Sequence, residues 1–180
     1  SFKAEHIVLC MGADLPLFLE AIGYDLGMYQ VTSGQLSILP KTTELAALQI
    51  ALNYSGYTTP LIEGRQYSGA GFEPTADTAV SQKAHLHNLE LMPVELRQLA
   101  GQPSGWQGRT SRRLAYPDRL PLAGEITPGL SVVSALGARG LTLARLIGKS
   151  VAHEIAGRPS ILPYQIMMAL HPQRFFDKAL

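Results

Sequence analysis

The stretch Gly129-Leu-Ser-Val-Val-Ser-Ala-Leu-Gly-Ala-Arg-Gly-Leu-Thr142 decides the fold, because an apolar strand runs here through a glycine-rich turn directly into a helix. Gly137 and Gly140 keep the turn free of side-chain bulk, so peptide N–H groups at the helix start can face a negatively charged ligand. The helix dipole adds to that attraction. The pattern predicts an anion-holding turn, although glycines in a short strand-to-helix connection also serve packing alone.

A helix is predicted to follow this turn. Ile147, Val151 and Ile155 recur at helical spacing and form one apolar face. Gly157 and Pro159 then end the helix.

Composition points to an ordinary folded protein. The chain has 180 residues, of which 46% are hydrophobic and 16% charged, which suits one large core or two small ones. A net charge of +1 predicts no overall attraction to nucleic acid or membrane, so polyanion binding would need a local patch. The one cysteine, Cys10, lies in an apolar run, which predicts a buried, reduced thiol and fits a cytoplasmic protein.

The middle of the chain is predicted to be an antiparallel unit inserted into an α/β layer. Glu63-Gly64 predicts a hairpin between strands over 57–62 and 65–72. Ser33-Gly34 is expected to join two short strands, and a helix over 75–100 is expected to be capped by Asp77 and broken at Pro93. Together with strands over 7–11, 108–114 and 130–134, this order predicts an α+β fold.

Four arginines crowd into eleven positions between Arg109 and Arg119. On a strand, Arg109 and Arg113 share one face, where their planar forks could bind a carboxylate. The alternative is a solvated basic edge. His85 and His87 are expected to be surface residues, because their side chains diverge on a helix and cannot share a metal. No metal, thiol or serine centre is predicted.

The ordered set of motifs resembles the D-amino-acid-oxidase-like FAD-dependent oxidoreductases. The motifs in question are Ala4–Ala13, Ser33–Leu36, Gly56–Pro60 with Glu63–Arg65, Gly108-Arg109, Arg113, Pro117–Pro121 with Gly124, and Leu136–Thr142. Trp106–Arg109 and Gly137–Gly140 are most similar to a branch that forms the oxidase module of a bifunctional tRNA-modifying enzyme. Family members open with a strand and a GxGxxG loop that are not found in this sequence, so we expect a piece that begins after that loop and holds little FAD by itself.

The resemblance implies two domains and a set of binding residues. Residues 1–26 and 104–180 would be the remainder of the Rossmann-type FAD-binding domain, and 27–103 the substrate-binding domain. Gly12 and Ala13 would lie close to the FAD, and Gly137, Ala138, Arg139, Gly140, Leu141 and Thr142 would pass along its isoalloxazine ring. Arg113 would grip the substrate carboxylate, Tyr57 would line the pocket, and Arg139 would face substrate or RNA phosphate. No catalytic acid or base is assigned.

The implied reaction is FAD-dependent removal of the carboxymethyl group from 5-carboxymethylaminomethyl-(2-thio)uridine at the tRNA wobble position, which gives aminomethyluridine. A methyltransferase module of the full-length chain would act next. Two alternatives stay open: an amine oxidase for free glycine or sarcosine, and a scaffold or RNA-binding piece without redox activity.

Overall fold

The computed structural model describes residues 3–176, which fall into two compact units. Unit 1 comprises the residues up to Val31 and those from Arg113 onward, and unit 2 comprises Thr32–Arg112. Helices and sheets occur in both, so the predicted α+β class is confirmed. The roles expected for the ranges 1–26 with 104–180 and 27–103 remain predictions.

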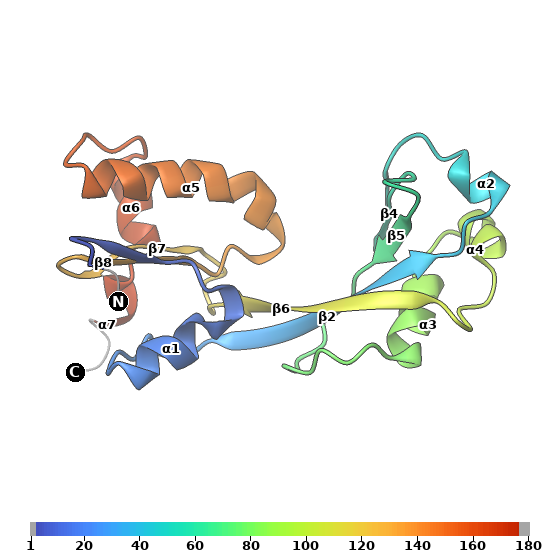
Figure 1. Cartoon of the computed structure of the whole chain (residues 1–180), viewed down its shortest axis with the longest axis horizontal. Coiled ribbons are helices and arrows are strands. Elements are labelled where there is room, and N and C mark those ends of the chain that lie inside the picture. Colours follow the sequence, from blue (N-terminus) through green and yellow to red (C-terminus); the bar gives the residue numbers. More distant parts are fainter. Residues whose placement is uncertain (1–2, 177–180) are drawn as a thin grey trace. The chain divides into compact units, whose positions relative to one another are not determined.

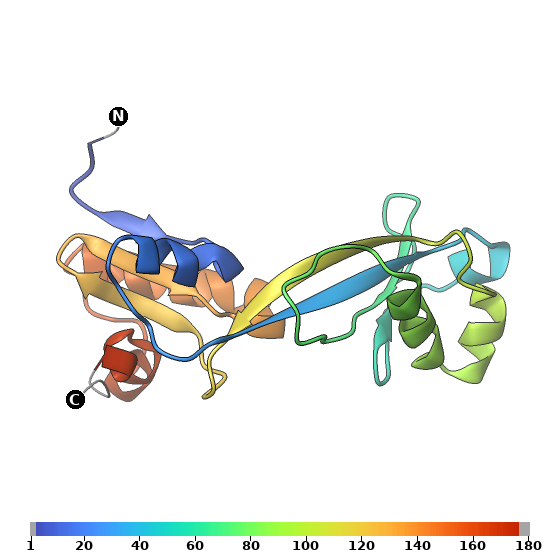
Figure 2. The same ribbon diagram turned by 90° about the horizontal axis from the view of Figure 1, so that it is seen from below.

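Unit 1 is a three-stranded sheet between helices. Its strands are β1 (Ile7–Leu9), β8 (Leu130–Ser134) and β7 (Leu122–Thr127), in the order β1-β8-β7. β1 runs parallel to β8, and β7 runs antiparallel to it. Helices α1 (Leu15–Ala21) and α5 (Gly140–Ile155) cover opposite faces of this sheet (Figures 1 and 2).

The two cores of unit 1 follow from strand alternation. Leu122 and Val132 face α1, and their sequence neighbours Ala123 and Val133 face α5. The predicted helix after the glycine turn is confirmed, with Ile147 and Val151 buried. Ile155 is 39% exposed, so the apolar face is shorter than predicted.

Arg174 joins the end of the described chain to the loop before β7. It lies in α7 (Gln173–Phe176), which follows α6 (Tyr164–Leu170). Its Nε donates to Asp118 Oδ2 at 2.8 Å, and Nη2 donates to the carbonyl of Pro121 at 3.0 Å. Its guanidinium also stacks 4.3 Å from the centre of the Phe175 ring. The Arg174 charge therefore fastens two segments that are distant in sequence.

Unit 2 is built on a five-stranded sheet in the order β3-β4-β5-β2-β6. Its strands are β2 (Gln30–Leu39), β3 (Leu52–Asn53), β4 (Tyr57–Thr58), β5 (Gln66–Gly69) and β6 (Gln107–Ala115). The remaining elements are the helices α2 (Thr43–Ala46), α3 (Gln82–Glu90) and α4 (Val94–Ala100). One core joins these helices to the sheet through Leu39, Leu45, Leu89, Met92, Leu96 and Ala100.

Polar side chains attach α3 to β2. Ser37 Oγ lies 2.8 Å from His85 Nδ1, and Asn88 Nδ2 donates to the same Oγ at 2.9 Å. Gln35 exchanges two hydrogen bonds with the backbone of Ser81. These bonds satisfy groups that would be costly to bury alone, and they fix one face of α3 on the sheet.

The Glu63-Gly64 hairpin is confirmed, but two neighbouring predictions are wrong. Glu63 and Gly64 have φ values of 50° and 77°, as the tightest hairpin turns require. Ser33-Gly34 forms no turn, because β2 runs unbroken through it. The helix predicted from Thr75 begins at Gln82, and Ser81 rather than Asp77 caps it by accepting from the Ala84 amide at 3.2 Å.

Cys10 is exposed, so its predicted burial is wrong: it follows β1 at an outer strand of the sheet. Among the described residues, no helix combines the length and the apolar character that a membrane crossing requires.

Candidate functional site

Two strand–turn–helix connections lie side by side in unit 1. Because β1 and β8 are parallel, with Leu9 opposite Val132, their carboxyl ends meet at one edge of the sheet. Each strand leads into a 3-10 turn, Gly12–Asp14 or Gly137–Arg139, and then into a helix. The turns have the related sequences Gly-Ala-Asp and Gly-Ala-Arg. The N-termini of both helices therefore lie at the same edge of the sheet, which is where ligands usually bind in such folds.

The glycine that opens each turn is required by the backbone. Gly12 and Gly137 have φ values of +58° and +60°, and a Cβ added to either would meet no atom within 4 Å. The left-handed conformation favours glycine, and the space beside it is open. The Ser134 hydroxyl donates to the Gly12 carbonyl oxygen at 2.8 Å, so the end of β8 is tied to the first turn.

The start of α5 is uncapped in the described part of the chain. Arg139 stands at the N-cap without a side-chain hydrogen bond to the helix. Gly137, Ala138 and Arg139 are exposed, and Leu141 is 101% exposed. Peptide N–H groups of the first turn are therefore not sealed by this chain. This edge suits a planar group on which negative charge develops, such as a flavin, because a helix start stabilises such charge.

The predicted cofactor residues therefore gather at one edge. Gly12 and Ala13 belong to the first turn, and 137–142 to the second turn and the first residues of α5. Their contact with FAD remains a prediction.

The two principal substrate residues were predicted on different elements. Arg113 is half-buried near the end of β6, next to Leu114 of the unit 1 core. Tyr57 lies on β4 in unit 2. A Cβ on Gly69 would lie 3.3 Å from the Tyr57 hydroxyl and 2.5 Å from Leu36 Cδ2. The phenol ring of Tyr57 can thus lie over β5 only because residue 69 has no side chain.

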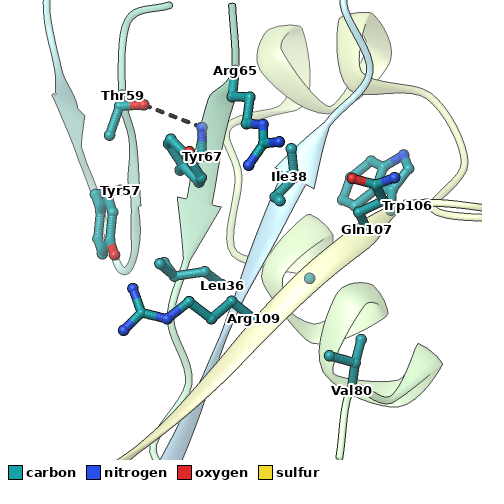
Figure 3. A pocket seen from close by; sticks show the side chains of 11 residues that line it. Leu36, Ile38, Tyr57, Thr59, Arg65, Tyr67, Val80, Trp106, Gln107 and Arg109 are labelled. Atoms are coloured by element: carbon teal, nitrogen blue, oxygen red, sulfur yellow. Dashed lines mark hydrogen bonds between the residues drawn. The ribbon is translucent and has the colours of Figure 1, made fainter. Parts of the chain in front are cut away.

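Unit 2 contains a pocket on the sheet face opposite its helices. Its volume is about 880 Å³, and Figure 3 shows most of its side chains. The lining residues are Leu36, Ile38, Tyr57, Thr59, Arg65, Tyr67, Val80, Trp106, Gln107, Gly108 and Arg109. Tyr57 and Arg109 were singled out from the sequence. Arg65 and Trp106 belong to motifs of the resemblance but were not predicted as site residues, nor was Tyr67, because segments distant in sequence come together at this face.

His85 is 2% exposed, so the expectation of a surface residue is wrong. Burial lowers the pKa of this imidazole, and the Trp106 backbone opposes that effect to a smaller degree. The ring packs edge-on against Trp106, with their centres 6.0 Å apart. Burial therefore favours the neutral form of His85, and the ring is part of the packing inside unit 2. Among the described residues, no group of three or more His, Cys, Asp or Glu could hold a metal ion.

Comparison with known proteins identifies both a family and related structures. A model of the family described as FAD dependent oxidoreductase (DAO) matches residues 1–154. The tRNA 5-methylaminomethyl-2-thiouridine biosynthesis bifunctional protein MnmC of Hahella chejuensis is 36% identical over 153 residues, or 79% of this chain and 24% of that protein. MnmC of Nitrosospira multiformis is 34% identical over 193 residues, or 100% of this chain and 30% of that protein. The chain thus spans less than a third of the length of these relatives.

Two solved structures share the fold. Glycine oxidase from Geobacillus kaustophilus has a TM-score of 0.77 at 22% identity, over 96% of this chain and 46% of that one. Iminodiacetate oxidase from Chelativorans sp. BNC1 has a TM-score of 0.74 at 22% identity. The match covers 95% of this chain and 47% of that one.

Proposed function

The chain belongs to the FAD dependent oxidoreductase (DAO) family, and from this we propose that it is part of an enzyme that modifies the wobble uridine of tRNA. The observation that carries the proposal is the 34% identity to MnmC across 100% of the chain. MnmC is named for the biosynthesis of 5-methylaminomethyl-2-thiouridine in tRNA. A tRNA substrate and a cytoplasmic location are parts of the same proposal, as is a methyltransferase module in the full-length protein.

The proposed reaction removes the carboxymethyl group from 5-carboxymethylaminomethyl-(2-thio)uridine. The carbon between amine and carboxylate loses a hydride, and the amine nitrogen loses a proton, which leaves an imine. Water hydrolyses the imine to glyoxylate and aminomethyluridine. FAD, when bound, supplies the two-electron acceptor for this oxidation. The reaction needs an oriented, unprotonated amine more than a strong base.

The open edge of unit 1 is proposed to hold the flavin. Gly12, Ala13 and residues 137–142 leave backbone exposed there, and the uncapped start of α5 directs N–H groups toward the space beside it. Their role is to bind the ring and stabilise negative charge on it. Arg139 is exposed and is proposed to meet the substrate or an RNA phosphate.

Recognition of the substrate is proposed to fall to Arg113 and Tyr57. The Arg113 guanidinium can donate two parallel hydrogen bonds to the carboxylate. Tyr57 presents an aromatic ring that is 38% exposed and can pack against the nucleoside. Arg113 belongs to unit 1 and Tyr57 to unit 2, and each role is proposed for that residue by itself.

The test uses the natural full-length protein that contains this chain. Absorbance in the flavin bands is expected, together with glyoxylate release from tRNA that carries carboxymethylaminomethyluridine. Faster oxidation of free glycine or sarcosine than of this tRNA would replace the proposal with a small-molecule amine oxidase. A colourless protein that takes up no added FAD would favour a scaffold without redox activity.

A further inference from the structure

The open face of the unit 2 sheet carries two rows of side chains across three strands. In the first row, Tyr67 lies opposite Ile38, and Thr59 donates its amide to the Tyr67 carbonyl at 2.9 Å. In the second row, Tyr57 lies opposite Gly69, and Leu36 approaches the same glycine from the other side. The rows make an apolar and aromatic floor, in which Leu36 and Tyr57 fill the space that a side chain at position 69 would take.

Two cations stand on this floor without an opposing charge. Arg65 and Arg109 are both exposed, and neither guanidinium has a hydrogen bond or ion pair with any described residue. No aspartate or glutamate lines the pocket. Figure 3 shows the Arg109 guanidinium pointing toward Tyr57 and that of Arg65 beside Ile38. An anionic ligand would therefore meet two separate positive groups in this pocket.

The volume and the chemistry of the pocket fit a nucleotide. About 880 Å³ exceeds what a carboxymethylamine needs and lies in the range of pockets for larger ligands. Aromatic rings that receive a base, with arginines that receive phosphate, are the usual means of binding single-stranded nucleic acid. Two guanidinium groups in one pocket can each donate hydrogen bonds to one of the two phosphates that flank a nucleotide in a strand.

We propose that this pocket binds one nucleotide of a single-stranded RNA, with its base on the floor and its two flanking phosphates at Arg65 and Arg109. This inference rests on the proposed function and deepens it, because it extends the proposed contact of Tyr57 with the nucleoside to the phosphates on either side. It also places sequence-independent phosphate recognition in unit 2.

Trp106 provides the readout, because it is the only tryptophan of the chain and lines this pocket. The 180-residue chain is titrated with uridine, 5′-uridine monophosphate, uridine 3′,5′-bisphosphate and inorganic phosphate while its fluorescence is followed. Affinity is expected to rise from uridine to the monophosphate to the bisphosphate, by about three- to tenfold per phosphate. Equal binding of uridine and the bisphosphate, or equal binding of inorganic phosphate alone, would overturn the proposal.

Variants that remove one positive charge test which arginine binds which phosphate. Arg65→Gln and Arg109→Gln are each expected to abolish the gain from one of the two phosphates. Arg158→Gln, at an exposed arginine of unit 1, should leave every affinity unchanged. Circular dichroism verifies that the variants are folded. An equal loss in all three variants, or no loss in the two pocket variants, contradicts the assignment.

The outcome is separable from that of the proposed function. If the full-length protein oxidises the modified tRNA but the fluorescence titration shows no response, only the nucleotide pocket is rejected. If the titration succeeds but free glycine is the preferred substrate, the proposed reaction is rejected and the pocket stands.

Discussion

A single guanidinium group, that of Arg113, is expected to decide whether the substrate is recognised by its carboxylate. The side chain is half-buried at the end of β6, where a bound carboxylate would be partly shielded from water. Under these conditions a charged, bidentate hydrogen bond contributes more than a surface ion pair. The contact is present before the reaction as well as during it.

Arg113→Met is therefore expected to raise the KM of the full-length enzyme about 10- to 100-fold with little change in kcat. The KM of Arg113→Lys should lie between those of the wild type and Arg113→Met, because lysine keeps the positive charge but lacks the planar guanidinium group. Arg158→Met is the matched control. Steady-state kinetics with the modified tRNA measure the effect, and an unchanged KM for Arg113→Met would show that the carboxylate binds elsewhere.

Arg174 stabilises the fold of unit 1 through hydrogen bonds from its guanidinium group. Its side chain is 13% exposed and bonded to Asp118, which is 33% exposed. Arg174→Met leaves the carbonyls of Leu170 and Pro121 without this donor. We expect the free energy of unfolding of unit 1 to fall by about 2 kcal/mol, discounted for the exposure of Asp118.

Urea unfolding followed by circular dichroism tests the loss. Arg158→Met is again the comparison, and its free energy of unfolding should stay within about 0.5 kcal/mol of the wild type. If Arg174→Met matches that control, the clamp contributes nothing measurable.

At the scale of the element, the start of α5 is the part of the fold that is proposed to contact the cofactor most directly. Gly140 has ordinary helical backbone, and a Cβ there would meet only Leu136 Cβ at 3.6 Å. The fold itself therefore does not require glycine at this position. A requirement for glycine would come from a ligand that approaches the backbone closely.

Gly140→Ala is expected to leave folding intact, or to stabilise the helix by up to about 1 kcal/mol, while FAD binding weakens. Gly148→Ala is the control on the same helix, since its added methyl also meets open space but lies two turns away. FAD retention of the full-length protein, measured by absorbance, separates the two. Equal retention would place the flavin away from this turn.

The sequence predictions were correct where neighbouring residues determine the structure, and they failed where residues distant in sequence determine it. The strand Leu130–Ser134, its glycine turn and the following helix were predicted because strand, turn and helix preferences agree within one stretch. Ser33-Gly34 carries turn-forming residues, yet Ser33 exchanges two backbone hydrogen bonds of 2.9 Å with Glu73, and this pairing holds the segment extended. The burial of His85 depends on Ser37, which lies 48 residues away. Arg65 and Trp106 line one pocket although they are distant in sequence, and their local sequences do not encode that proximity.

At the scale of the whole molecule, the two units are expected to respond differently to acid. In unit 2, burial lowers the pKa of His85 from 6.5. Below pH 6.5 the unfolded chain takes up a proton that the folded unit resists, so stability is present above that pH and is lost as the pH falls. In unit 1, burial would raise the pKa of Asp118, but the hydrogen bond and charge of Arg174 outweigh it and lower the value from 3.8. That contribution is present above pH 3.8 and is lost only in stronger acid.

Urea unfolding of unit 2, followed by Trp106 fluorescence, should therefore show decreasing stability from pH 7 to pH 5. His85→Gln is expected to be less stable at pH 7 but to vary less with pH. His87→Gln, at an exposed position two residues further along the same helix, should keep the wild-type slope. An equally steep slope in His85→Gln would assign the acid sensitivity to another group.

The interruption of one unit by the other sets an order for synthesis on the ribosome. The strand pair that organises unit 1 joins Ile7 to Leu130, so its first half must wait for more than a hundred residues to emerge. Residues 32–112 are contiguous and can condense during this interval, which makes the nascent chain fold from the middle outward. Until β8 has been synthesised, the apolar strand β1 has no partner strand, and a chaperone could bind it.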